Sequence, residues 1–130
     1  MIAYKIQTDG RAIDLRFVNS IEPGDIAIEG DVIPDIHTLH SLSYIKNLKI
    51  SAVKAEASKK IDVTLPDWQV RRHHDQVELG VATTLTTANY TAKQQTCQAI
   101  RDASNTIETE IQVSSDPNSI DIANHTAWPV

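Results

Sequence analysis

The sequence predicts an α+β protein, with a small N-terminal β-rich head, an irregular connector and a C-terminal helical bundle or coiled-coil-like module. Three patterns along the 130 residues predict this fold: alternating apolar residues near the N-terminus, clustered Pro, Gly and Asp up to about residue 40, and apolar residues every three or four positions beyond it. We therefore expect two parts, a head with its connector at 1–45 and a helical module with an irregular tail at 46–130.

The head is expected to hold a β-hairpin followed by turns. Apolar side chains occupy every second position in residues 2–6 and again in residues 13–17, which is the pattern of half-buried strands. Asp9 and Gly10 lie between the two runs, and glycine adopts the positive φ that tight turns require. Pro, Gly and Asp then recur at 22–25, 29–31 and 34–35, so loops and short extended pieces are favoured there over helix.

Two helices are expected next. The first begins near residue 41, and the residues on its apolar face are Ile50, Val53, Ala57 and Ile61. It ends at Leu65-Pro66, because proline lacks the donor that continues a helix and restricts the residue before it. Asp67 could cap a second helix that carries Trp68 and runs toward Leu79, with Gly80 suited to its C-terminus.

The third helix carries a narrow apolar stripe, which we call the seam: Cys97, Ile100, Ser104, Ile107 and Ile111. Such a seam requires a partner helix, either from this chain or from another copy. Residues 116–118 break the helix, and the irregular tail after it either packs through Ile120, Ile122 and Trp128 or stays unpacked.

Charge varies along the chain. The net charge is −5. The head has three basic and seven acidic residues, so it is acidic. Residues 46–80 have seven basic and five acidic residues, and residues 81–130 have two basic and five acidic residues. There is no domain-wide basic footprint, and the lysines at 46–60 have no interleaved aromatic residues for stacking on bases, so no nucleic-acid partner is predicted. No apolar run is long enough for a signal peptide or a membrane span, so no membrane partner is predicted.

Catalysis and metal binding have weak support. The single cysteine, Cys97, lies on the seam and is expected to be a core residue, and no glycine-rich phosphate loop or nucleophile turn is present. His37 and His40 have a spacing that suits two ligands on one helical face, but they follow a turn-rich stretch, while His73 and His74 are adjacent and point apart. A metal on a symmetry axis of an oligomer stays open. We predict no enzyme and no cofactor.

The two tryptophans each lie near a proline, in Pro66-Asp67-Trp68 and in Trp128-Pro129. One interpretation is internal packing, in which Trp68 anchors the second helix on the first and Trp128 pins the tail. The other is that an indole contacts a ligand or partner.

The order of motifs after residue 50 resembles the C-terminal helical module of small tailed-bacteriophage proteins encoded beside tail-fibre genes. The matching runs are Ala55-Glu56-Ala57-Ser58-Lys59-Lys60-Ile61, Leu65-Pro66-Asp67-Trp68-Gln69 with Arg71 and Glu78-Leu79, Ile100-Arg101-Asp102-Ala103-Ser104-Asn105-Thr106-Ile107-Glu108, and Ala127-Trp128-Pro129. The resemblance covers residues 50–130.

This resemblance implies a tail or tail-fibre-associated protein, a structural component or an assembly factor, that packs against tail-fibre or baseplate proteins as a homo- or hetero-oligomer. Its location would be the virion tail, or the host cytoplasm during phage assembly. The candidate interface residues are Trp68, Arg71, Arg72, Cys97, Ile100, Ser104, Ile107, Ile111 and Trp128. The alternative is a phage-encoded inhibitor that binds a host protein through its acidic surface.

Overall fold

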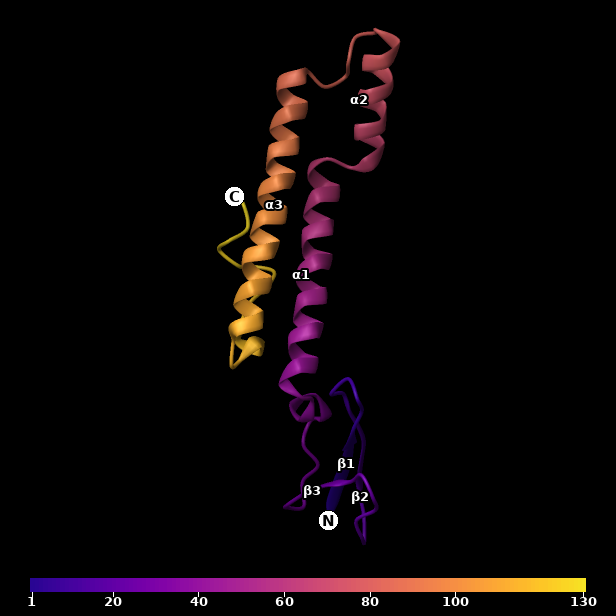
Figure 1. The fold of residues 1–130 in the computed structure, drawn as a ribbon, viewed down its shortest axis with the longest axis vertical. Helices are drawn as coiled ribbons and strands as arrows, with labels where there is room; N and C mark the ends of the chain where they lie inside the picture. Colours follow the sequence, from indigo (N-terminus) through magenta and orange to yellow (C-terminus); the bar gives the residue numbers. More distant parts are fainter. The chain divides into compact units, whose positions relative to one another are not determined.

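The computed structural model describes residues 1–130, and it confirms the α+β class: a three-stranded antiparallel sheet is followed by three α-helices (Figure 1). The chain divides into two compact units, Met1–Leu48 and Lys49–Val130. We call them the head and the helical unit. Their boundary falls inside the first long helix, α1 (Leu42–Thr64), close to the predicted boundary at 45/46.

The head contains the predicted hairpin. Strands β1 (Ile2–Ile6) and β2 (Ala12–Phe17) pair antiparallel, with Ile2 opposite Phe17 and Ile6 opposite Ala12. The register shifts at a bulge between Ala3 and Lys5. A third strand, β3 (Ile26–Ile28), pairs with the other edge of β1, so the strand order is β2-β1-β3. At three residues, β3 is one of the short extended pieces expected in the connector.

The connector also contains one short helix, just beyond the clusters at 22–35 for which loops and short extended pieces were predicted. A 3-10 helix, η1 (Ile36–Leu39), forms because the Asp35 carboxylate accepts a hydrogen bond of 3.0 Å from the His37 amide and thereby caps this single turn. The preceding Pro, Gly and Asp clusters indicated turns, and one extra hydrogen-bonded turn is enough to make this helix.

The hairpin loop closes tightly against the start of α1. The Ser41 amide donates to the Gly10 carbonyl at 2.9 Å, and Gly10 has a φ of +90°. A Cβ atom on Gly10 would lie 1.8 Å from the Ser41 side-chain oxygen, a distance that no real contact tolerates. Glycine is therefore required at position 10 both for the backbone conformation and for space.

The first two helices end as predicted, but the second begins differently. Helix α1 ends at Thr64, just before Leu65-Pro66. Helix α2 (Asp67–Leu79) is closed by Gly80, which has a φ of 67° and whose amide donates hydrogen bonds to the Gln76 and Val77 carbonyls. Asp67 does not cap α2. Pro66 is at the cap position, and Asp67 is the first helical residue. The negative charge of Asp67 still stabilises α2, because it lies at the positive end of the helix dipole.

Helix α3 (Thr87–Val113) is the longest element. The Thr86 hydroxyl caps it by accepting a 3.1 Å hydrogen bond from the Asn89 amide. It is followed by a 3-10 turn, η2 (Pro117–Ser119), and then by the tail. In the helical unit, α3 runs back beside α1, and the tail lies along α3 (Figure 1).

The main core of the helical unit forms between α1, α3 and the tail. Its buried residues are Val53, Ala57, Ile100, Ala103, Ile107, Ile111, Ile120 and Trp128. Two lysines add hydrogen bonds that stabilise this packing. Lys49 donates a 2.8 Å hydrogen bond to the Ile120 carbonyl. Lys93 donates a 3.1 Å hydrogen bond to the Thr64 carbonyl, at the C-terminal end of α1. The partner that the seam requires is thus supplied by this chain.

Candidate functional site

The most distinctive surface lies on α2, and we call Trp68, Arg71 and Arg72 the α2 patch. The Trp68 side chain is 59% exposed, and the Arg72 guanidinium carbon lies 5.1 Å from the centre of its ring. Arg71 is exposed and has no ion pair. The interpretation in which Trp68 anchors α2 on α1 is therefore wrong, because Trp68 is exposed and belongs to neither buried cluster.

A histidine, rather than the tryptophan, holds α2 in place. His73 is the one buried residue of α2, and its ring stacks on Tyr90 of α3, with centroids 3.9 Å apart and planes at 11°. On the same face, one turn earlier, is Gln69. The buried Gln69 Oε1 and His73 Nδ1 atoms make no hydrogen bond with protein atoms. No local pattern predicts this contact, because the stacking joins two helices through a long-range pair.

All five seam residues are buried. Ile100, Ile107 and Ile111 belong to the main core, and Cys97 belongs to a smaller cluster with Leu65 and Tyr90. Ser104 is also buried. These residues pack inside the helical unit, so the accessible members of the predicted interface are the three residues of the α2 patch.

The tail is folded, and Trp128 pins it as one interpretation predicted. Trp128 is 7% exposed, and its indole N–H donates to the Ile122 carbonyl at 2.7 Å. His125 adds a second attachment: its Nε2 lies 2.6 Å from a carboxylate oxygen of Glu110, while its Nδ1 accepts a 3.0 Å hydrogen bond from the Ala127 amide. The accepting Nδ1 carries no proton, so Nε2–H is the donor to Glu110.

A turn in the tail contains one of the two carboxyl groups with shifted pKa values. The side chain and amide of Asn124 both donate to Asp121, each at 3.2 Å. These hydrogen bonds favour the charged carboxylate and lower the pKa of Asp121 below its ordinary value. The arrangement stabilises the turn that leads to His125 and Trp128.

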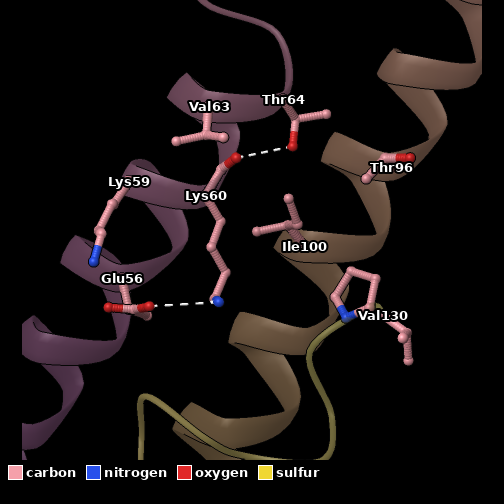
Figure 2. Close-up of a pocket in the computed structure, with 9 residues that line it drawn as sticks. Glu56, Lys59, Lys60, Val63, Thr64, Thr96, Ile100 and Val130 are labelled. Carbon is pink, nitrogen blue, oxygen red and sulfur yellow. Dashed lines mark hydrogen bonds and ion pairs between the residues drawn. The ribbon is translucent and has the colours of Figure 1, made fainter.

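A cleft of about 330 Å³ opens between α1, α3 and the end of the tail (Figure 2). Val63 and Ile100 supply apolar surface. The Lys60 ammonium lies 3.4 Å from the Glu56 carboxylate and 5.4 Å from the centre of the Trp128 ring. Lys59 adds a second cation, which has no ion pair. Lys60 is neutralised by Glu56, and Val63 and Ile100 give the cleft apolar surface. The cleft is therefore suited to holding an apolar or weakly acidic side chain.

Two further clefts adjoin each other along α3. One of about 430 Å³ has Leu65, Tyr90 and Cys97 among its lining residues, and one of about 370 Å³ includes Ala57 and Ser104. Both are lined by Ile61, which the spacing placed on the apolar face of the first helix, and by Arg101, which was not selected as a site residue. The clefts themselves could not be predicted from a local pattern, because they arise from how the helices pack.

The histidine pairs do not form a metal centre. His37 Nδ1 and His40 Nε2 lie 3.2 Å apart, and His40 Nδ1 accepts a 2.8 Å hydrogen bond from the Ala12 amide. Because Nδ1 accepts, neutral His40 carries its proton on Nε2 and donates it to His37, which leaves His40 no free lone pair for a metal. No three His, Cys, Asp or Glu side chains in the chain gather in a metal-binding arrangement. His73 and His74 contact Tyr90 instead.

Part of the acidic charge of the head is neutralised within the head. Nη2 of Arg16 lies 2.8 Å from both carboxylate oxygens of Asp25, whose side chain is fully buried. Asp14 and Glu22 lie 3.5 and 3.8 Å from the same guanidinium, and both also approach Lys5. The Arg16 hydrogen bond, with a second one from the Glu22 amide, lowers the pKa of Asp25, and Asp25 in turn raises the pKa of Arg16.

None of the helices has the length and apolar character that crossing a membrane requires. The chain matches no protein-family model, and comparisons with curated proteins and with solved structures also find no match.

Proposed function

We propose that this protein is a bacteriophage tail or tail-fibre-associated protein, a structural component or assembly factor that acts by protein–protein packing. The observation that carries the proposal is the α2 patch, an exposed indole stacked under a guanidinium on a helix of a folded bundle. Nothing in this proposal requires catalysis.

The chemistry of the α2 patch favours a protein partner. Tryptophan and arginine are the residue types that contribute most often to the binding energy of protein interfaces. The Trp68 ring offers a large apolar area at small entropic cost, and Arg72, which stacks on it, is already held in one orientation. Arg71 provides a second guanidinium one turn from Trp68, so the surface can accept both apolar and acidic groups.

The phage assignment is supported by where the resembling residues lie. All of the matching runs fall in the helical unit, on α1, α2, α3 and the end of the tail. Ile100, Ile107 and Trp128 form its core, and Trp68 forms its surface patch. In this proposal, α1, α3 and the tail form the platform, and α2 presents the contact.

Binding to a neighbouring tail-fibre or baseplate protein tests the proposal. The purified full-length chain should bind that protein with micromolar or tighter affinity, and Trp68→Ala should weaken binding by roughly thirtyfold, as removal of an interface hot spot of about 2 kcal/mol would. Val113→Ala, another exposed apolar position, is the matched control and should leave the affinity unchanged. No binding by the native chain at about 100 μM would overturn the proposal.

Two further measurements separate the roles within it. Mass spectrometry of purified particles should find the chain if it is a permanent component, whereas its absence alongside a required gene supports an assembly factor. Capture of a host enzyme through the acidic head, unaffected by Trp68→Ala, would instead support the inhibitor alternative.

A further inference from the structure

Exposed apolar side chains are concentrated in the head. Nine of the sixteen large hydrophobic residues with substantial exposure belong to Met1–Leu48, although this unit is much the smaller of the two. A unit of this size buries a smaller fraction of its surface on folding than a larger domain does, so it gains stability from a partner. The most exposed of the nine is Val32, at 83%, and Ile33 follows it directly.

These two residues lie beside unpaired carboxylates. We call residues 29–33 the acidic segment: Glu29 and Asp31 are exposed and make no ion pair, unlike Asp14, Glu22 and Asp25, which bind Arg16. The acidic segment therefore presents two free negative charges next to an apolar pair on a loop of the head.

The α2 patch has the complementary composition. Arg71 and Arg72 lie three and four residues after Trp68, on the next helical turn, and the Arg72 guanidinium lies over the indole. Asp67 and Asp75 are four residues to either side of Arg71, but neither forms an ion pair with it. Both guanidinium groups therefore remain available to carboxylates from outside the helix.

We propose that the α2 patch binds the acidic segment of a second copy of this chain. Glu29 and Asp31 of one copy pair with the two guanidinium groups of the other, and Val32 covers the indole of Trp68. This inference rests on the proposed use of the α2 patch as an interface, and it gives the patch a second occupant besides the tail protein. Because each copy carries both surfaces, the contact is heterologous and builds a ring or a chain of copies.

Sedimentation velocity of the purified, nuclease-treated full chain tests this contact without any tail protein. At about 20 mM salt, we expect association that increases between about 1 and 100 μM protein, and we expect about 500 mM salt to weaken it because these charges are exposed to solvent. A chain that stays monomeric throughout overturns the inference, while the binding assay for the tail protein is unaffected by that result.

Reversed charges identify the two surfaces. The variants R71E/R72E and E29K/D31K should each raise the dissociation constant at least tenfold. An equimolar mixture of the two should associate again, because the acidic patch of one then meets the basic segment of the other. If each variant failed to associate alone because it was misfolded, mixing the two would not restore association. Association in the mixture therefore shows that both variants are folded.

Matched controls change the same amount of charge elsewhere. R11E/K59E and D62K/D116K alter exposed positions outside both surfaces and should associate like the native chain. Failure of the mixture to recover, or an equal loss in the controls, would overturn the assigned contact. A contact that forms without concentration dependence would assign the acidic segment to the α2 patch of its own chain. Association that appears only when the nuclease treatment is omitted would assign the patch to nucleic acid. Each of these results also overturns the inference.

Discussion

The Nη2 atom of Arg16 lies 2.8 Å from both carboxylate oxygens of Asp25, and it thereby joins the strand β2 to the turn that precedes β3. The same carboxylate accepts a 2.9 Å hydrogen bond from the Glu22 amide. Asp25 is thus a buried acceptor for three contacts, and its loss would release both the guanidinium and the turn.

This arrangement predicts an acid-sensitive head. The pKa of Asp25 is lower in the folded chain than its ordinary value of 3.8, so its stabilising effect is fully present above that value and is lost as the pH falls through the folded-state pKa. Amide hydrogen exchange of β1 and β2 should therefore accelerate at acid pH, and Asp25→Asn should remove part of this pH dependence. Glu29→Gln, at an unpaired carboxylate, is the control, and an equal effect there would contradict the assignment.

Glycine at position 10 is predicted to be more important than other glycines with positive φ. Gly10→Ala adds a severe clash with Ser41 to the backbone strain, whereas at Gly24 and Gly30 nothing lies within 4 Å of the added Cβ. We expect Gly24→Ala and Gly30→Ala to cost about 1–2 kcal/mol and Gly10→Ala to cost more. Urea unfolding of the head, followed by NMR, measures the difference, and equal losses at all three positions would contradict the close approach.

The seam is predicted to be essential for folding of the helical unit. Ile107 is fully buried, so Ile107→Ala should lower the free energy of unfolding by about 2–5 kcal/mol. Ile107→Asp should unfold the unit, because an unpaired charge would replace a core side chain. Circular dichroism during urea unfolding tests both. The exposed Val113→Ala should change stability by less than about 0.5 kcal/mol.

The two tryptophans should report opposite environments. In Trp68→Phe the remaining indole is buried, so its emission should be shifted to shorter wavelength and resist quenching by acrylamide. In Trp128→Phe the remaining indole is exposed and should be quenched readily. Trp128→Phe also removes the hydrogen bond to Ile122, which should cost about 1–3 kcal/mol. Similar quenching in the two variants would contradict the assigned positions.

The sequence predicts those features of the fold that depend on neighbours along the chain. Alternation indicates β1 and β2, three- and four-residue spacing indicates the seam, and Pro66 and Gly80 mark helix ends through their own backbone restrictions. The third strand and η1 are less visible, because three or four residues are too few to establish a period.

The candidate site is harder to predict because it depends on which side of a helix is covered. Trp68 and Trp128 are equally apolar and both lie near a proline, yet one is exposed and the other is in the core. The difference arises from His73, which takes the buried face of α2 by stacking on Tyr90, a contact between residues seventeen positions apart. Local sequence does not encode that choice.

The position of Trp128 also sets the order in which the helical unit can mature on the ribosome. Synthesis proceeds from the N-terminus, so α1 and α3 emerge while Ile107 and Ile111 still lack the tail residues that complete their core. The nascent protein must pass through a stage with an open apolar seam, which the Trp128 indole covers only after α1 and α3 have been synthesised.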